Sequence, residues 1–198
     1  MAFKISQKAK AATAQGSGSG GYLSLSKLEN KSSVRIHLLG DEPLDFYQTW
    51  IESPDGSQIK PLRFVDDPSP SEIEAELGDF VRRQNYEKTG PDPVTYSMAF
   101  FVWNYSTEEV QLLQLTQKGL IRELDQLLSM EDYQATEDWD FVISKDTSGP
   151  PSSWYSLRPA PIKKGSREVI DAKWAEAQDK GYNLQELLLN GNPFGGKG

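Results

Sequence analysis

Residues 94–105, VTYSMAFFVWNY, decide the fold class of this chain. Successive side chains of a β-strand point to opposite faces, so this stretch divides into two alternating sets. The apolar set is the better core face: Val94, Tyr96, Met98, Phe100 and Val102. The other set is small near its start and aromatic at its end, which suits a binding groove: Thr95, Ser97, Ala99, Phe101, Trp103 and Tyr105. Residues 108–115 are predicted to form its hairpin partner, which makes the chain an antiparallel β protein at its centre.

Further strands are predicted on both sides of this hairpin, at residues 22–25, 34–39, 46–51, 58–64, 139–145 and 154–159. Helical spacing of apolar residues predicts helices at 71–83, 120–128, 166–180 and 184–190, and Ser71 with Glu74 resembles a capping box. We therefore expect a mainly β protein with helices (α+β), built as an antiparallel barrel of the oligonucleotide-binding (OB) type and elaborated by helices. The alternative is an open antiparallel sheet packed on helices.

Three segments are expected along the chain. Residues 1–21 form a flexible basic N-terminal arm with a Gly/Ser linker, and Lys4, Lys8 and Lys10 on this N-terminal arm are the candidates for self-association. Residues 22–165 form the OB-like domain, and residues 166–198 form C-terminal helices and a tail.

Composition narrows the classes of function. The 198 residues have no cysteine and one histidine, which excludes disulfides, thiolate catalysis and cysteine-bearing zinc sites. No apolar run reaches the roughly 20 residues that span a bilayer, and the N-terminus lacks a signal-peptide centre, so we expect a cytoplasmic protein without a membrane partner. The net charge is −8, but residues 66–139 hold 16 acidic and five basic side chains, so the rest of the chain is slightly basic.

Large aromatic residues recur on the predicted strands beside cationic ones. Tyrosine and tryptophan combine a flat apolar face with a polar tip, which suits stacking on nucleobases, while lysine and arginine suit phosphates. The stacking candidates are Tyr47, Trp50, Tyr96, Trp103, Tyr105, Trp154 and Tyr155, with Tyr96 open to a core role as well. The phosphate candidates are Lys60, Arg63, Lys145, Arg158 and, more weakly, Arg35.

Catalytic alternatives find less support. Asp138 and Asp140 would share a strand face, as a carboxylate-metal nuclease requires, but paired carboxylates are usually solvated turns. Asp171-Ala172-Lys173 echoes a nuclease element that must lie on a strand, and the spacing here is helical. No phosphate-binding loop or nucleophile motif is present. We expect no enzyme, no metal site and no cofactor.

The chain resembles the single-stranded DNA-binding, helix-destabilising proteins of T-even-like phages, including the cyanophage type. The similarity rests on the basic start MAFKISQKAK, the strand SSVRIHLLG, the strand VTYSMAFFVWN, the strand and helix VQLLQLTQKGLIRELDQLL, and the hairpin DWDFVISKDTSGPPSSWYSLRP. The resemblance implies cooperative self-association through the N-terminal arm, and protection of single-stranded DNA in replication, recombination and repair. It also implies contacts with replication proteins and residence in the cytoplasm of an infected host cell.

Two features depart from that family. Its zinc subdomain has no counterpart, since residues 52–93 hold no cysteine or histidine, and the sequence shows no acidic stretch like the family's C-terminal tail but reads NPFGGKG at residues 192–198. The predicted function is sequence-tolerant binding of single-stranded DNA. The alternatives are an OB-type protein-interaction module of a phage assembly or structural protein, and a carboxylate-metal nuclease.

Overall fold

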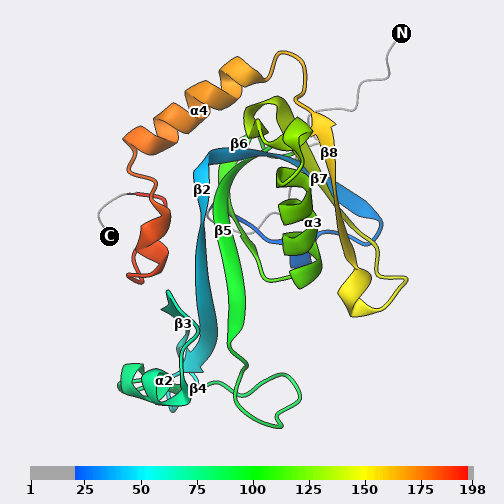
Figure 1. The fold of residues 1–198 in the computed structure, drawn as a ribbon. Helices are drawn as coiled ribbons and strands as arrows, with labels where there is room; N and C mark the ends of the chain where they lie inside the picture. Colours follow the sequence, from blue (N-terminus) through cyan, green and yellow to red (C-terminus); the bar gives the residue numbers. More distant parts are fainter. Residues whose placement is uncertain (1–20, 196–198) are drawn as a thin grey trace, which may run out of the picture.

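The computed structural model describes residues 21–195 as one eight-stranded sheet with three α-helices (Figure 1). The strands are β1 (Tyr22–Leu23), β2 (Ser32–Glu52), β3 (Ile59–Phe64), β4 (Val81–Arg82), β5 (Thr95–Asn104), β6 (Glu109–Leu115), β7 (Trp139–Lys145) and β8 (Tyr155–Pro161). The α-helices are α2 (Pro70–Glu76), α3 (Lys118–Leu128) and α4 (Arg167–Asp179). Short 3-10 turns complete the chain: η2 (Leu25–Lys27), η3 (Glu131–Tyr133), η4 (Thr136–Asp138), η5 (Pro151–Ser153) and η6 (Leu184–Leu187). The protein is therefore mainly β with helices, in the α+β class.

The sheet is organised around β2, which is 21 residues long. Its strand order is β1-β6-β5-β2-β7-β8, with β3 and β4 paired to the far end of β2. The register with β5 shifts between Leu39 and Leu44, where Gly40 takes a φ of 81°. A bulge of this kind bends a strand. In Figure 1 the second part of β2 accordingly runs away from the body of the sheet and forms, with β3, β4, α2 and the start of β5, an extension that we call the arm.

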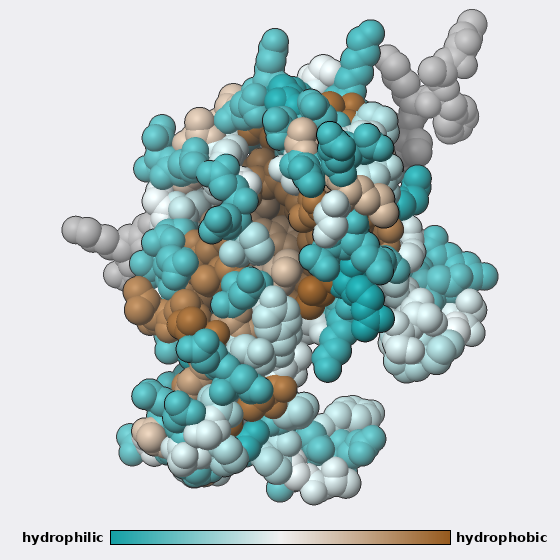
Figure 2. All heavy atoms as spheres, viewed as in Figure 1, coloured by the Kyte–Doolittle hydropathy of each residue, from teal (hydrophilic) through white to brown (hydrophobic). Residues whose placement is uncertain are grey.

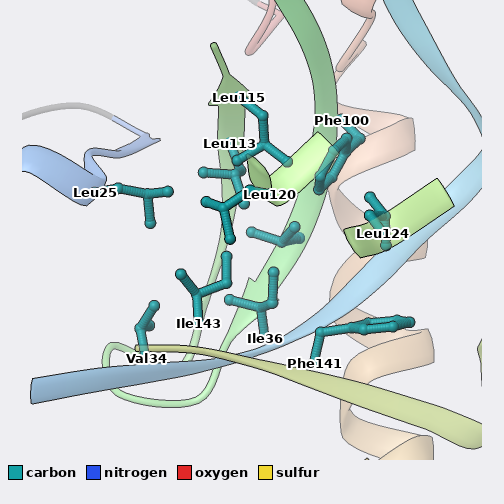
Figure 3. Packing of buried hydrophobic residues seen from close by; sticks show 11 residues of the cluster. Leu25, Val34, Ile36, Phe100, Leu113, Leu115, Leu120, Leu124, Phe141 and Ile143 are labelled. Atoms are coloured by element: carbon teal, nitrogen blue, oxygen red, sulfur yellow. The ribbon is translucent and has the colours of Figure 1, made fainter. Parts of the chain in front are cut away.

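The main core lies on the inner side of the curved sheet, beneath α3 (Figure 3). Leu120 and Leu124 lie one helical turn apart on α3 and are buried against Phe100 and Ile36 of the strands. Within the described residues β6 and β8 share no ladder, and α3 covers the space between them. The Glu123 side chain accepts a hydrogen bond from the backbone N–H of Leu157 at 2.7 Å, so a helix side chain satisfies one N–H group on the free edge of β8.

A second core covers the opposite, outer face of β5, and here the structure differs from the sequence-based prediction. Phe101 and Trp103 were expected to line a groove, but α4 and the segment after it pack over them. Ile170 and Leu187 are each 1% exposed in this cluster, and the Trp174, Tyr182 and Phe194 rings lie 5.3–6.3 Å from that of Phe101. Both faces of β5 are therefore core at its centre.

Several local predictions are confirmed and others need correction. The strands predicted at 34–39 and 46–51 form one continuous strand, β2, and the helix predicted at 71–83 ends at Glu76, so that Val81–Arg82 forms β4. The helix predicted at 184–190 is the short 3-10 turn η6. The hairpins β2–β3, β5–β6 and β7–β8 form as expected. Helix α2 begins earlier than predicted, because Ser69 and Glu72 make the capping box and Pro70 fits the first helical position. The residues at 22–25 give a two-residue strand parallel to β6, followed by a 3-10 turn, rather than an antiparallel strand.

Candidate nucleic-acid interface

Three aromatic side chains form one row across the arm. Tyr47 on β2 lies directly opposite Tyr96 on β5 and directly opposite Phe64 on β3. Residues opposite one another in a sheet share a face, and neighbouring strands lie about 4.8 Å apart, so the three side chains stand side by side. All three are partly exposed, and Phe64 also packs against a third core formed by Ile51, Leu62 and Ile73 of α2. We call Tyr96, Tyr47 and Phe64 the aromatic row.

The tyrosines of this row are held in a defined geometry. Their ring centroids lie 5.5 Å apart with an interplanar angle of 70°, an edge-to-face contact. The Tyr96 hydroxyl donates to Asp45 Oδ1 at 2.8 Å. Burial, followed by this hydrogen bond and the charge of Asp45, raises the pKa of Tyr96 to about 12, so its phenol remains a donor at neutral pH. The row is thus a semi-rigid apolar surface with a fixed carboxylate at one end.

A cation lies on the same face of the arm. Lys60 is opposite Ile51, four residues along β2 from Tyr47, which puts it on the same side of the sheet as the row. Its Nζ lies 3.9 Å from the centroid of the Phe80 ring, a cation–π contact, while the residue as a whole is exposed. Between Tyr47 and Lys60 this face is covered, because Ile51 and Leu62 are buried beneath Ile73 of α2 in the third core. Lys60 therefore lies beyond that core from the aromatic row, while Asp45 lies directly beside the row.

The outer surface of the body gathers two other predicted residues, Arg35 and Tyr105, around a buried carboxylate. Asp140 is fully buried and accepts from Arg35 Nε at 2.6 Å and from Tyr105 Oη at 3.0 Å, and it lies 3.0 Å from His37 Nδ1. Arg35 also packs over the Tyr105 ring. Arg158 is exposed and lies in the same cross-strand row, because Arg35 is opposite Val142 and Val142 is opposite Arg158.

This arrangement bears on the carboxylate-metal alternative. Asp140 is already bonded to Arg35, and exposed Asp138 pairs instead with Arg167 at 3.0 Å. Residues 21–195 contain no group of three or more side chains suited to hold a metal ion.

The β7–β8 hairpin uses its polar groups internally. Lys145 Nζ donates to the carbonyls of Ser26 and Leu28 at 2.8 and 2.7 Å, and the Tyr155 hydroxyl donates to the Leu25 carbonyl at 3.2 Å. Trp154 is partly exposed and donates its indole N–H to the Gly149 carbonyl at 2.8 Å. Lys145 and Tyr155 therefore hold η2 against the sheet, and Trp154 is the member of this group with an accessible face.

Three further predicted residues, Arg63, Trp50 and Trp103, lie on the side of the sheet opposite the aromatic row. Arg63 donates to the Leu187 carbonyl at 2.9 Å and lies over the Phe46 ring, and burial lowers its pKa. Trp50 is partly exposed on that side. Trp103 is 4% exposed and offers no face for stacking. Lys4, Lys8 and Lys10 lie outside the described residues.

Sequence reasoning missed two members of the surface, Phe64 and Asp45. Their signal is the cross-strand register, which pairs Phe64 with Tyr47, together with the two-residue spacing of Asp45 and Tyr47.

The face of the molecule seen in Figure 2 is mostly hydrophilic, with hydrophobic surface in the middle of the body, on the arm and over the C-terminal segment. No helix in residues 21–195 has the length and apolar character needed to cross a membrane.

Comparison with known proteins identifies no relative: no family model, no curated protein and no solved structure matches this chain.

Proposed function

We propose that this protein binds single-stranded nucleic acid, specifically single-stranded DNA, without strict sequence preference and without catalysing a reaction. The aromatic row is the observation that carries the proposal. Base stacking on aromatic side chains contributes about 1–3 kcal/mol per base, and it tolerates sequence because every base has a π-face. Duplex DNA hides those faces, so a row of rings selects unpaired strands.

The strand order supports an OB-type barrel as the scaffold. Taken as first to fifth strands, β2, β5, β6, β7 and β8 lie in the spatial order third, second, first, fourth, fifth, with α3 between the third and the fourth. OB barrels bind ligands beside the loops that follow the first and fourth strands. In this chain the first of these loops is expanded into the arm, at whose base the aromatic row lies, and the second carries Trp154.

The acidic net charge is compatible with this function. Charges on a protein surface are screened beyond about 8 Å at physiological salt, so the local surroundings of the binding surface matter more than the total. Lys60 lies on the face of the row, and Arg158 is exposed on the body. We propose these two side chains as phosphate contacts.

The biological role that we propose is protection of single strands in phage replication, recombination and repair, as the resemblance implies. Lys4, Lys8 and Lys10 would then join neighbouring molecules along one strand, and replication proteins would be the further partners. The acidic side chains within residues 66–139 would provide charges complementary to the three lysines.

One observation favours a second function, a protein-interaction module. Ile59 and Val81 are 48% and 46% exposed and lie on either side of Glu52 at the end of the arm. Apolar side chains clustered on a surface often mark a protein contact. This cluster is on the face opposite the aromatic row, so the two functions can be tested by separate substitutions.

A binding titration tests the proposal. Fluorescence anisotropy of a labelled oligo-dT should report binding that weakens with salt, and Tyr47→Leu should weaken it about ten-fold, because leucine keeps apolar bulk but has no ring face. Tyr86→Leu is the matched control, since Tyr86 is fully exposed and lies outside the row. Equal affinities for all three proteins would remove the aromatic row from the binding surface, and absence of binding to any single strand would favour the protein-interaction function.

A further inference from the structure

We propose that Asp45 makes the aromatic row discriminate among bases, favouring those with an exocyclic amino group, above all guanine, over thymine. The inference rests on the proposed function and adds a specificity-determining residue to that surface.

Asp45 lies beside the aromatic row. It lies two residues before Tyr47 on β2 and therefore on the same face, about 7 Å along the strand. Asp45 is exposed, and its Oδ1 accepts from the Tyr96 hydroxyl. Among the described residues no other hydrogen bond or ion pair involves its carboxylate. Oδ2 is thus free at the end of the row, where the edge of a stacked base would lie.

The Asp45 end of the row offers only hydrogen-bond acceptors. An ionised carboxylate only accepts hydrogen bonds, and each of its oxygens can accept two. The Tyr96 hydroxyl already donates its only proton to Asp45. Its oxygen can therefore only accept a hydrogen bond from a further partner. A base that reaches this end must therefore supply donors.

The bases differ sharply in this respect. Guanine presents N1–H and N2–H side by side and can meet a carboxylate with two parallel bonds, the strongest arrangement of this kind. Cytosine and adenine present one amino group each. Thymine presents a single N–H between two carbonyls, which would face the carboxylate and be repelled by it.

The charges on this face also orient the strand. Asp45 lies two residues from Tyr47 in one direction along the sheet, and Lys60 lies opposite the residue four positions away in the other, so the two charges are separated by about 20 Å. Between them Ile51 and Leu62 are buried beneath Ile73 of α2, so the charge nearest the aromatic row is that of Asp45. Asp45 repels phosphates from its end of the row. The base edges are therefore the part of the ligand that faces Asp45.

The test compares three oligonucleotides of equal length: all thymine, thymine with one central guanine, and thymine with one central hypoxanthine, which lacks the N2 amino group. The wild-type protein should bind the guanine strand about ten-fold more tightly than the all-thymine strand, with hypoxanthine between them. Asp45→Asn should bring the guanine-to-thymine ratio close to one, because an amide also donates and can meet thymine.

Asp66→Asn is the matched control, because Asp66 is also exposed and the charge change is the same. It should keep the ratio of the wild type even if every affinity rises with the lost charge. A ratio near one in the wild type, or an unchanged ratio in Asp45→Asn, would overturn the proposal. Failure of all three strands to bind would instead refute the proposed function itself.

Discussion

The buried carboxylate of Asp140 provides the sharpest test of the fold. Its Oδ2 accepts from Arg35 Nε at 2.6 Å and from the backbone N–H of Lys163 at 3.2 Å, while its Oδ1 accepts from Tyr105. His37 Nδ1 also lies 3.0 Å from Oδ1. One side chain therefore ties together β2, β7, the end of β5 and the loop before α4. Asp140→Asn keeps its volume and removes its charge.

The expected loss follows from these contacts. An asparagine cannot accept at both ends, so its amide N–H groups would meet the donors of Arg35 or Tyr105. Removing one partner of a buried ion pair costs about 3–5 kcal/mol. The Arg35 side chain is 34% exposed and can turn towards water, which recovers part of that loss. We expect about 2–4 kcal/mol, which in a protein of this size lowers the melting temperature by roughly 5–15 °C.

Urea denaturation followed by tryptophan fluorescence measures this change. Asp138→Asn is the control, since Asp138 is exposed and its pair with Arg167 should contribute less than about 1 kcal/mol. If Asp140→Asn were no more destabilising than Asp138→Asn, the carboxylate would not act as the junction described above.

Three further outcomes are expected. Leu124→Ala should cost about 2–5 kcal/mol in the same denaturation assay, because Leu124 of α3 is 4% exposed in the main core, and a loss below 1 kcal/mol would mean that α3 does not seal it. The phenol of Tyr96 should ionise near pH 12; since its pKa is raised from 10, its contribution to stability is present below pH 10 and lost as the pH rises towards 12. Ultraviolet difference spectra of the wild type and Tyr96→Phe would measure this, and an ordinary phenolate transition near pH 10 would contradict it. Deleting residues 1–20 should leave binding to a short oligonucleotide unchanged and weaken binding to long strands, and equal losses on both lengths would assign the lysines of that segment to the binding surface.

Much of the local structure follows from residue patterns. The alternation in residues 94–105 predicts β5, and the repeat of apolar residues at helical spacing predicts α3 with Leu120 and Leu124 towards the core. These predictions succeed because a strand and an amphipathic helix each reveal in their own sequence which sides differ in polarity. The class of the fold, mainly β with helices, was accessible for the same reason.

Which surface stays open was decided only by the tertiary structure. Alternation divides β5 into two faces but does not say what covers each, and the segment that buries Trp103 comes about seventy residues later in the chain. The aromatic row depends on the register of β2 with both β3 and β5, which long-range pairing sets. Arg63 and Lys145 have the residue type of phosphate contacts, yet both donate to backbone carbonyls, because folding brought unpaired acceptors within their reach. Sequence by itself determined most of the strands and the two longer helices with their polar sides, while the packing of distant segments determined which of those sides a ligand can reach.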